Sequence, residues 1–407
     1  MARVAFITNC FLDDRGQVFG GGAELHLYQL ARLARDLGAD PTVYQPGREA
    51  MQRRVDGIDV QNIDATPKGI WNLGTRQALL DGHTFLHYQY PWSGAARAVK
   101  PGTWVTATQQ GVYWDIPFVA AANRWYPGGR LARWLLPVWR YQQREGAFRA
   151  VAGCREVLAE DTSLLRVIQS DRPELRARIH VASNFCDIVS ENPSAYTDGV
   201  HSGIDMIRRA KSTGSIVVLV PRNVSFTKGA WWLPAIVQEV TKQLEAKCHF
   251  FVTGVAIDTA ATAKRCEREL PNLVNSLDIE AKGALSFLNG VPHSQMVHAY
   301  LASDIVLIPT FAYEATSISA IEAMMLGRAV VATNVGGLND LIDDEWTGLL
   351  TQTTVKAIAA GIVRLARDVP LRERLSSAAR TKAEACLTLE SWRERVRPFI
   401  QRNGWCS

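Results

Sequence analysis

Short hydrophobic runs alternate with longer amphipathic stretches along most of the chain. In the first half these runs are RVAFITN, PTVYQP, HTFLHYQY, WVTATQQG and RAVAGC. In the second half they are SIVVLVPR, HFFVTG, DIVLIPT and AVVATN, with helices expected to open near Gly229, Thr259, His293, Thr316 and Thr354. Such runs between helical patterns are typical of strands joined by crossover helices. The pattern therefore predicts an α/β fold built on parallel sheets.

The alternation stops near Asn192, in the polar and turn-rich stretch NPSAYTDGVHSG, and starts again at SIVVLVPR. Because 407 residues are many for one domain, we expect two. Residues 1–190 are expected to form a Rossmann-like domain, residues 191–212 a linker, and residues 213–387 a second Rossmann-like domain. A helix over residues 388–407 is expected to pack back on the first domain. The two sheets would face a central cleft, because open parallel sheets bind ligands at the carboxyl ends of their strands.

Composition narrows the class of protein. The formal net charge is +5, a mild basic balance that suits a phosphate-bearing ligand, and the sequence has no nucleic-acid-binding motif. The seven cysteines are scattered without a CxxC pair, which favours reduced thiols and a cytoplasmic location over disulfides or a metal site. We find no apolar stretch with the length of a signal peptide or a membrane span.

Two acids, Glu314 and Glu322, lie around the start of a helical pattern in PTFAYEATSISAIEAMMLG. Thr316 and Ser317 are N-cap residue types, and hydrophobic residues at helical spacing follow them. Glu314 thus precedes a helix N-terminus, whose N–H groups suit an anion; simple favourable placement beside the helix dipole is the alternative. Glu322 falls at the margin of the apolar face, so its carboxylate needs donors. These could be the hydroxyls of a ligand or an ion pair with Arg328.

Two further stretches carry candidate ligand-binding residues. Arg222 and Lys228 in PRNVSFTKG follow a predicted strand, so they are expected at the carboxyl end of the second sheet, where they could hold a diphosphate. Solvated surface charge is the alternative. Gly20, Gly21 and Gly22 separate the first strand from a helix and would let a ligand approach the backbone closely. The run is not a GxGxxG fingerprint, which disfavours a nicotinamide cofactor.

The segment around the two glutamates resembles the E-x7-E signature of retaining nucleotide-sugar glycosyltransferases of family 4, which have the GT-B fold. The continuation GRAVVATNVGGLNDLIDDEWTGLL is similar to that family, as are GGGAELHLYQLARLARDLG, GVYWD, PRNVSFTKG and YLASDIVLIPT. The resemblance therefore spans nearly the full chain. It implies an enzyme that moves a sugar from a UDP- or GDP-linked donor to the hydroxyl of a small molecule or saccharide. The second domain would hold the donor and the first would face the acceptor.

The resemblance also implies roles for single residues. Glu322 would bind the ribose diol, Glu314 the hydroxyls of the transferred sugar, and Arg222 with Lys228 the donor diphosphate. The implied donor site consists of Gly21, Gly22, Arg222, Lys228, Glu314, Thr316, Ser317 and Glu322, and the catalytic set of Glu314, Arg222, Lys228 and Gln110. Recognition of the base is expected from the loop backbone around Gly283 to Gly290.

The chain departs from the family in two places. Gln110 stands where the family commonly has a histidine, and an amide cannot titrate, so a proton-relaying role at this position is in doubt. Asp115 could instead orient an acceptor hydroxyl, and His87 is expected either to line the acceptor side or to be a structural histidine. Ala315 replaces a frequent glycine, so we expect ordinary backbone there, with phosphate-facing amides from Thr316 and Ser317.

The sequence has no DxD motif and no convincing carboxylate pair for double displacement, so neither a metal nor a cofactor is expected. A same-face mechanism, in which the departing diphosphate takes the acceptor proton, follows from the resemblance. Two alternatives are a nucleotide-sugar epimerase of the same architecture and a catalytically silent nucleotide-sugar-binding homologue. An epimerase would turn over the donor without an acceptor, and a silent homologue would only bind it.

The segment from Arg124 to Arg155 combines seven arginines and three tryptophans with one acid, Glu145. A membrane-surface or anionic-acceptor patch is one interpretation. We favour a segment with solvated arginines and inward-packed tryptophans, interrupted at Pro137. A soluble acceptor is therefore expected, and peripheral membrane contact is the less favoured alternative.

Overall fold

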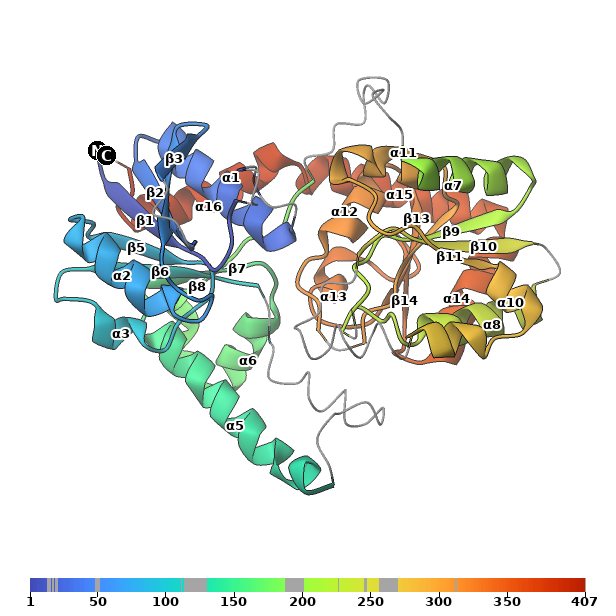
Figure 1. Ribbon diagram of the computed structural model, residues 1–407, viewed down its shortest axis with the longest axis horizontal. Coiled ribbons are helices and arrows are strands. Elements are labelled where there is room, and N and C mark those ends of the chain that lie inside the picture. The colour runs from blue at the N-terminus through green and yellow to red at the C-terminus, as the bar shows by residue number, and fades with distance from the viewer. Residues whose placement is uncertain are drawn as a thin grey trace. The chain divides into compact units, whose positions relative to one another are not determined.

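The computed structural model describes residues 1–12, 16, 18, 21–47, 52–110, 112, 130–186, 201–225, 227–244, 247–255, 270–311 and 313–406. The chain forms two compact units (Figure 1). Unit 1 comprises Met1–Asn184 and Glu390–Ser407, and unit 2 comprises Phe185–Leu389. The last helix of the chain thus belongs mainly to unit 1.

The described part of unit 1 contains an eight-stranded sheet of order β3-β4-β2-β1-β5-β6-β7-β8. Its strands are β1 (Arg3–Ile7), β2 (Asp40–Pro46), β3 (Gln52–Val55), β4 (Ile58–Ile63), β5 (Phe85–Tyr88), β6 (Trp104–Gln109), β7 (Glu156–Ala159) and β8 (Ile179–Val181). All neighbours pair in parallel except β3 and β4, which form an antiparallel hairpin. Apolar strands such as β1 and β7 are buried on both faces, as expected for a sheet covered by helices on either side.

The helices of unit 1 are α1 (Gly22–Asp36), α2 (Ile70–Leu80), α3 (Ala95–Ala98), α5 (Arg130–Ala152), α6 (Ser163–Asp171), the 3-10 helix η1 (Pro173–Arg178) and α16 (Leu389–Arg402). In Figure 1, α1 and α16 lie together on one side of the sheet and α2, α3 and α5 on the other. The rings of His26 on α1 and Trp392 on α16 meet edge to face at 5.3 Å. Helix α16 therefore closes the core of unit 1.

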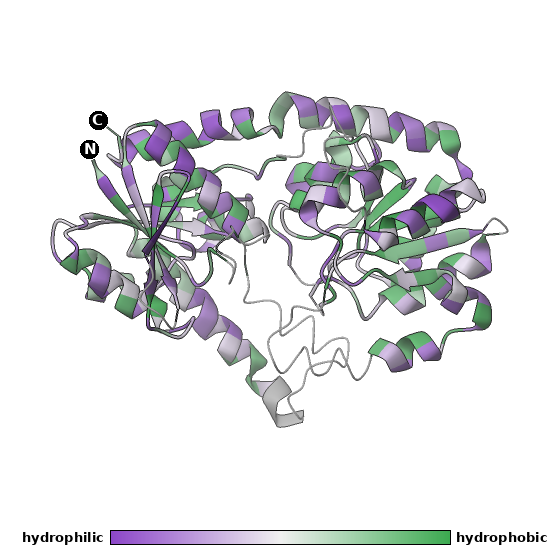
Figure 2. Ribbon diagram, turned by 45° about the horizontal axis from the view of Figure 1, so that its top comes forward, coloured by the Kyte–Doolittle hydropathy of each residue, from purple (hydrophilic) through white to green (hydrophobic). Residues whose placement is uncertain are grey.

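Unit 2 contains, in its described residues, a six-stranded parallel sheet of order β11-β10-β9-β12-β13-β14. Its strands are β9 (Ile216–Val220), β10 (Cys248–Val252), β11 (Leu285–Phe287), β12 (Ile305–Ile308), β13 (Ala329–Thr333) and β14 (Leu349–Thr351). Figure 2 shows these strands as mainly hydrophobic, whereas the surrounding helices alternate between hydrophobic and hydrophilic residues. A sheet with this composition is stable only when helices cover both of its faces.

The helices of unit 2 are α7 (Ser202–Ser212), α8 (Leu233–Gln243), α10 (Ile279–Gly283), η3 (His293–Gln295), α11 (Met296–Leu301), α12 (Ile318–Met325), α13 (Leu338–Leu341), α14 (Val355–Arg367) and α15 (Val369–Cys386). The side chains of Thr354 and Asp368 accept hydrogen bonds from Ala357 and Leu371 and so cap α14 and α15. None of the helices in the described parts of the chain combines the length and hydrophobicity needed to span a membrane.

The two sheets confirm the predicted α/β class with parallel strands, and each has one point where the strand order reverses. In unit 1 this point lies between β1 and β5, and in unit 2 between β9 and β12. Loops leave the carboxyl ends of such a strand pair in opposite directions and open a crevice, which is the usual ligand site of open α/β sheets. The candidate residues should therefore be sought after β9 and β12.

Three local expectations were wrong. The run RAVAGC is the end of helix α5 and the turn after it, and the strand follows at Glu156–Ala159. Pro137 does not interrupt α5, which runs from Arg130 to Ala152 through it. Residues 202–212, expected as part of a linker, form α7, because Ile204 and Ile207 are buried against unit 2.

Candidate active site

Glu314 lies between β12 and α12, and its carboxylate meets two cations. Its Oε2 accepts hydrogen bonds from Nη2 of Arg222 at 2.5 Å and from Nζ of Lys228 at 2.9 Å. The hydroxyl of Thr310 donates a third at 2.9 Å. Burial would raise the pKa of Glu314, but the two cations outweigh it and lower the pKa to about 2. Glu314 is therefore a carboxylate at neutral pH and offsets one of the two positive charges.

Arg222 follows β9 and is held from several sides. Its Nη1 donates to Oγ of Ser317 at 2.9 Å, and the residue is 8% exposed. Its Nε has no hydrogen-bond acceptor among the described residues. A buried guanidinium with spare donors can bind a further anionic group such as a phosphate.

Two glycines fix the loops that carry these charges. Gly229, at φ +89°, follows Lys228, and a Cβ there would lie 1.9 Å from the carbonyl oxygen of Pro309. Gly336, at φ +54°, leaves no room for a Cβ because the carbonyl oxygen of Glu314 would be 2.0 Å away. Both loops therefore pack backbone against backbone, which brings Lys228 and Glu314 together at the end of β12.

The N-terminus of α12 lies beside this cluster. Ser317 is its N-cap residue, and Thr316 and Ser317 are each 2% exposed. Ala315 is not among the described non-glycine residues with positive φ, so its backbone is ordinary, as expected. The first free N–H groups of α12 and two cations thus occupy one end of the sheet, an arrangement suited to a diphosphate.

Glu322 lies within α12 and is 3% exposed. Nε2 of His293 lies 2.6 Å from its Oε1, and the hydroxyl of Tyr300 donates to Oε2 at 2.7 Å. The ion pair considered with Arg328 is not formed, because that guanidinium donates to the carbonyl oxygens of Leu326 and Ser303. A carboxylate has about four lone-pair sites, so Glu322 can still accept from a diol.

The candidate residues of unit 1 lie in different environments: some are at a helix start, some are buried, and some fall outside the described residues. Gly21 caps α1 and Gly22 begins it, whereas Gly20 and Asp115 lie outside the described residues. Gln110 directly follows β6 and is 8% exposed. His87 is fully buried, with its ring nitrogens 2.9 and 3.0 Å from the hydroxyls of Thr106 and Thr108, and burial lowers its pKa. This geometry is that of a structural histidine.

Sequence reasoning missed a buried carboxyl next to Gln110. Glu160, directly after β7, is 3% exposed and accepts a hydrogen bond from Nδ2 of Asn184 at 2.8 Å. Nδ1 of His26 lies 3.8 Å from its Oε1, and burial lowers the pKa of this histidine to about 3, so the imidazole is neutral. Burial raises the pKa of Glu160 to about 8, against the opposing hydrogen bonds from Asn184 and Gln110. The sequence feature that could have identified Glu160 is its position directly after an apolar, buried strand.

Replacing Glu160 with glutamine should make the stability of the protein less sensitive to pH. The carboxyl is protonated in the fold up to about pH 8 and ionises near 4.5 in the unfolded chain, so the wild type loses stability as pH rises between these values. The loss is on the order of 1.4 kcal/mol per pH unit. Denaturant unfolding at pH 5, 7 and 9 should show that the free energy of unfolding of Glu160→Gln increases relative to that of the wild type as the pH rises. The exposed Glu174→Gln should show no such trend; an equal difference at all three pH values for Glu160→Gln would contradict the assignment.

The tryptophans of α5 do not pack inward as expected. Trp134 is 83% exposed, Leu135 59%, Val138 54%, Tyr141 64% and Trp139 37%. The helix makes its ion pairs further along, where Arg144 contacts Asp171 and Glu145 contacts Arg172. Exposed apolar side chains thus gather on two turns of α5.

Within the described ranges, we find no group of three or more His, Cys, Asp or Glu side chains placed to hold a metal ion. The chemically distinctive residues are instead the Arg222, Lys228 and Glu314 cluster and the hydrogen-bonded Glu322, all in unit 2. Glu160 and Gln110 form a second polar group at the carboxyl end of the sheet in unit 1.

Comparison with known proteins is consistent with this geometry. Residues 205–382 match the family model described as glycosyl transferases group 1. The chain is 25% identical over 396 residues to a D-inositol 3-phosphate glycosyltransferase of Corynebacterium aurimucosum, covering 90% of this chain and 88% of that protein. It is 24% identical over 383 residues to an alpha-maltose-1-phosphate synthase of Mycolicibacterium smegmatis, covering 90% and 89%.

Solved structures share the fold of the whole chain. Sucrose-phosphate synthase from Thermosynechococcus elongatus superposes with a TM-score of 0.72 at 15% identity over 99% of both chains. Anabaena Alr3699/HepE, solved in complex with UDP-glucose, superposes with a TM-score of 0.69 at 18% identity, over 99% of this chain and 100% of that one.

Proposed function

We propose that this chain, whose residues 205–382 match the glycosyl transferases of group 1, moves a sugar from a nucleoside diphosphate donor to an acceptor hydroxyl with retention of anomeric configuration. The observation that carries this proposal is the contact of Arg222 and Lys228 with Glu314 at the strand-order reversal of unit 2. Two cations beside a helix N-terminus suit the diphosphate, and a carboxylate between them suits the sugar attached to it.

In this proposal, each part of the nucleotide sugar (the diphosphate, the transferred sugar and the ribose) is bound by a different set of residues. Arg222 and Lys228 hold the diphosphate, with help from the amides of Thr316 and Ser317. Glu314 accepts hydrogen bonds from hydroxyls of the transferred sugar, and Glu322, positioned by His293 and Tyr300, accepts them from the ribose. The known complex of the HepE protein with UDP-glucose supports a UDP-linked donor.

The chemistry proceeds on one face of the sugar. The bond between the anomeric carbon and the diphosphate oxygen breaks while the bond to the acceptor oxygen forms, and the departing diphosphate takes the acceptor proton. Arg222 and Lys228 stabilise the negative charge that grows on the leaving group, where fixed cations have their largest effect. Neither a metal nor a cofactor enters this scheme. A nucleotide-sugar epimerase or a silent homologue is less favoured, because the relatives that match nearly the whole chain are named as a glycosyltransferase and a synthase.

We further propose a cytoplasmic location. The buried residues Cys154 and Cys248 are free thiols, and the sequence has no CxxC pair, which suits a reducing compartment.

A donor screen followed by a transfer assay tests the proposal. UDP, GDP and their hexose conjugates are compared by thermal shift, because a ligand at 100 times its dissociation constant stabilises a protein by about 2.7 kcal/mol. The stabilising donor is then incubated with sugar acceptors, with and without EDTA, and the anomeric proton coupling of the product is read by NMR. We expect transfer with retention that survives EDTA. Inversion, complete loss with EDTA, or donor turnover without an acceptor would each contradict the proposal.

A further inference from the structure

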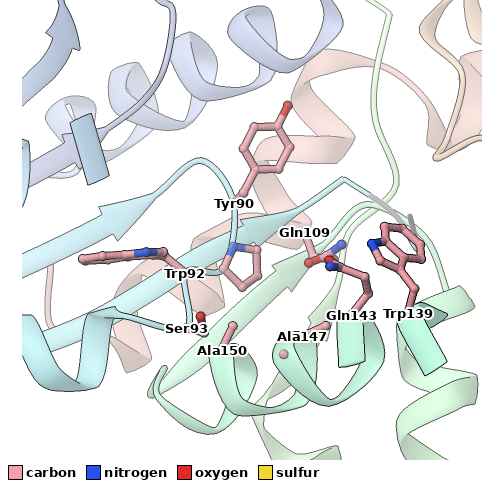
Figure 3. A pocket seen from close by; sticks show the side chains of 10 residues that line it. Tyr90, Trp92, Ser93, Gln109, Trp139, Gln143, Ala147 and Ala150 are labelled. Carbon is pink, nitrogen blue, oxygen red and sulfur yellow. The ribbon is translucent and has the colours of Figure 1, made fainter. Parts of the chain in front are cut away.

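Unit 1 contains a cavity of about 350 Å³ between α5 and the loop that follows β5 (Figure 3). The residues that line it are Tyr90, Pro91, Trp92, Ser93, Gln109, Trp139, Gln143, Gly146, Ala147 and Ala150. Its volume lies within the range of about 300 to 1,000 Å³ that small-molecule sites occupy. Gln109 ends β6, so the cavity lies at the carboxyl end of the sheet, next to Gln110.

The described lining combines polar and apolar groups and carries no charge. It offers amides, hydroxyls and aromatic rings, and two neighbouring charged side chains of α5 are paired with residues that do not line the cavity. Arg144 pairs with Asp171, and Glu145 pairs with Arg172. A phosphate or carboxylate bound here would lack a cation among these residues, and burying it so would cost free energy. The lining thus favours an uncharged polar ligand.

Figure 3 shows how the polar and aromatic groups are arranged. The amide ends of Gln109 and Gln143 lie close to each other and beside the indole of Trp139, whereas the rings of Tyr90 and Trp92 extend to other sides. Trp139 is 37% exposed, so part of its ring is accessible to a ligand. An aromatic face next to amides matches a sugar ring, which has an apolar C–H face and a rim of hydroxyls that both donate and accept hydrogen bonds.

The floor of the cavity is made of small residues on α5. Ala147 and Ala150 line it together with Gly146, and a Cβ built on Gly146 would meet no atom within 4 Å. This position can therefore take a larger side chain without a clash at its first carbon. The helix leaves space at this point for a ligand.

We propose that this cavity binds the acceptor as a neutral saccharide, with a sugar ring against Trp139 and its hydroxyls bonded to Gln143. That the bound sugar is the acceptor rests on the proposed transfer function. That the ligand is a neutral saccharide rests only on the residues that line the cavity. A neutral acceptor would distinguish this chain from relatives whose names contain a phosphorylated inositol or maltose.

Direct binding to the full chain tests the proposal without any turnover. Glucose, galactose, mannose and maltose are titrated by saturation-transfer NMR and calorimetry, beside glucose 6-phosphate and vesicles of anionic phospholipid. We expect at least one neutral sugar to bind, more tightly than glucose 6-phosphate. Trp139→Ala should weaken that sugar's binding about tenfold, which is about 1.4 kcal/mol. Gly146→Leu should abolish the binding by filling the cavity, with a melting temperature that is unchanged or higher because leucine favours a helix more than glycine does.

Trp134→Ala is the matched control, since Trp134 lies on the same helix, is more exposed and does not line the cavity. It should bind the sugar as the wild type does. Binding of none of the four sugars, equal binding by Gly146→Leu and the wild type, or a preference for the phosphorylated sugar or the vesicles would overturn the proposal. Thermal shift with the nucleotide sugar tests the proposed transfer function separately from the proposed saccharide site. The cavity variants should still bind the nucleotide sugar even where they no longer bind the saccharide.

Discussion

Arg222→Ala and Lys228→Ala are each expected to lower turnover by about 100-fold or more. In the proposed reaction the diphosphate leaves with growing negative charge, which two cations fixed in advance would stabilise without having to move. Nη2 of Arg222 and Nζ of Lys228 both lie within 2.9 Å of the same oxygen of Glu314, which shows that they converge on one point. Steady-state rates with saturating donor and acceptor measure the effect.

Two controls separate lost chemistry from lost structure. Arg222→Lys keeps the charge but loses the forked donor set, so its turnover should fall between that of the wild type and that of Arg222→Ala. Lys242→Ala removes an exposed cation in the last turn of α8 in unit 2 and should leave turnover unchanged. Near-normal turnover in both alanine variants, with folding confirmed by thermal melting, would place the leaving group elsewhere.

Glu314→Gln is expected mainly to lower turnover, whereas Glu322→Gln is expected mainly to weaken nucleotide binding. Glu314→Gln should lower turnover about 100-fold, because this carboxylate is proposed to contact the sugar that changes in the transition state. Its affinity for the nucleoside diphosphate should be kept or increased, since Arg222 and Lys228 no longer share their charge with a carboxylate. Glu322→Gln should weaken nucleotide binding about tenfold and leave saturated turnover largely intact, because the ribose does not react.

Calorimetry with the nucleoside diphosphate and kinetics with saturating donor make this comparison. Glu314→Gln should also melt at a lower temperature than the wild type, because two partly or fully buried cations lose their counter-ion. Equal losses of nucleotide affinity in both variants would show that the two carboxylates do not divide the donor between them.

The sequence predicted the central strands well and the edges poorly. Runs such as SIVVLVPR and DIVLIPT are apolar on both faces, and they became β9 and β12. RAVAGC is equally apolar but too short to tell a buried helix end from a buried strand. The hairpin of β3 and β4 escaped notice because its strands are polar, although Asp56 and Gly57, both at positive φ, form the two-residue Asp-Gly turn that marks such hairpins.

The same limit applies to the candidate site. Glu314 and Glu322 were found because their spacing around a helix start is a local pattern. The partners of Glu322, His293 and Tyr300, belong to other elements, and no periodicity connects them to it. Contacts of this kind arise only when parallel strands bring their carboxyl ends together. Family resemblance supplied the roles, and the fold supplied the geometry that allows them.

Unit 1 takes part of its core from residues that follow all of unit 2 in the chain. Trp392 and Phe399 of α16 are fully buried there, and Trp405 packs edge to face on Phe6. At about 5 to 20 residues per second, a ribosome reaches Trp405 on the order of 10 to 40 s after Asn184. Unit 2, which is continuous in sequence, can begin to fold within that interval, whereas the first 184 residues lack this part of their core until α16 is synthesised.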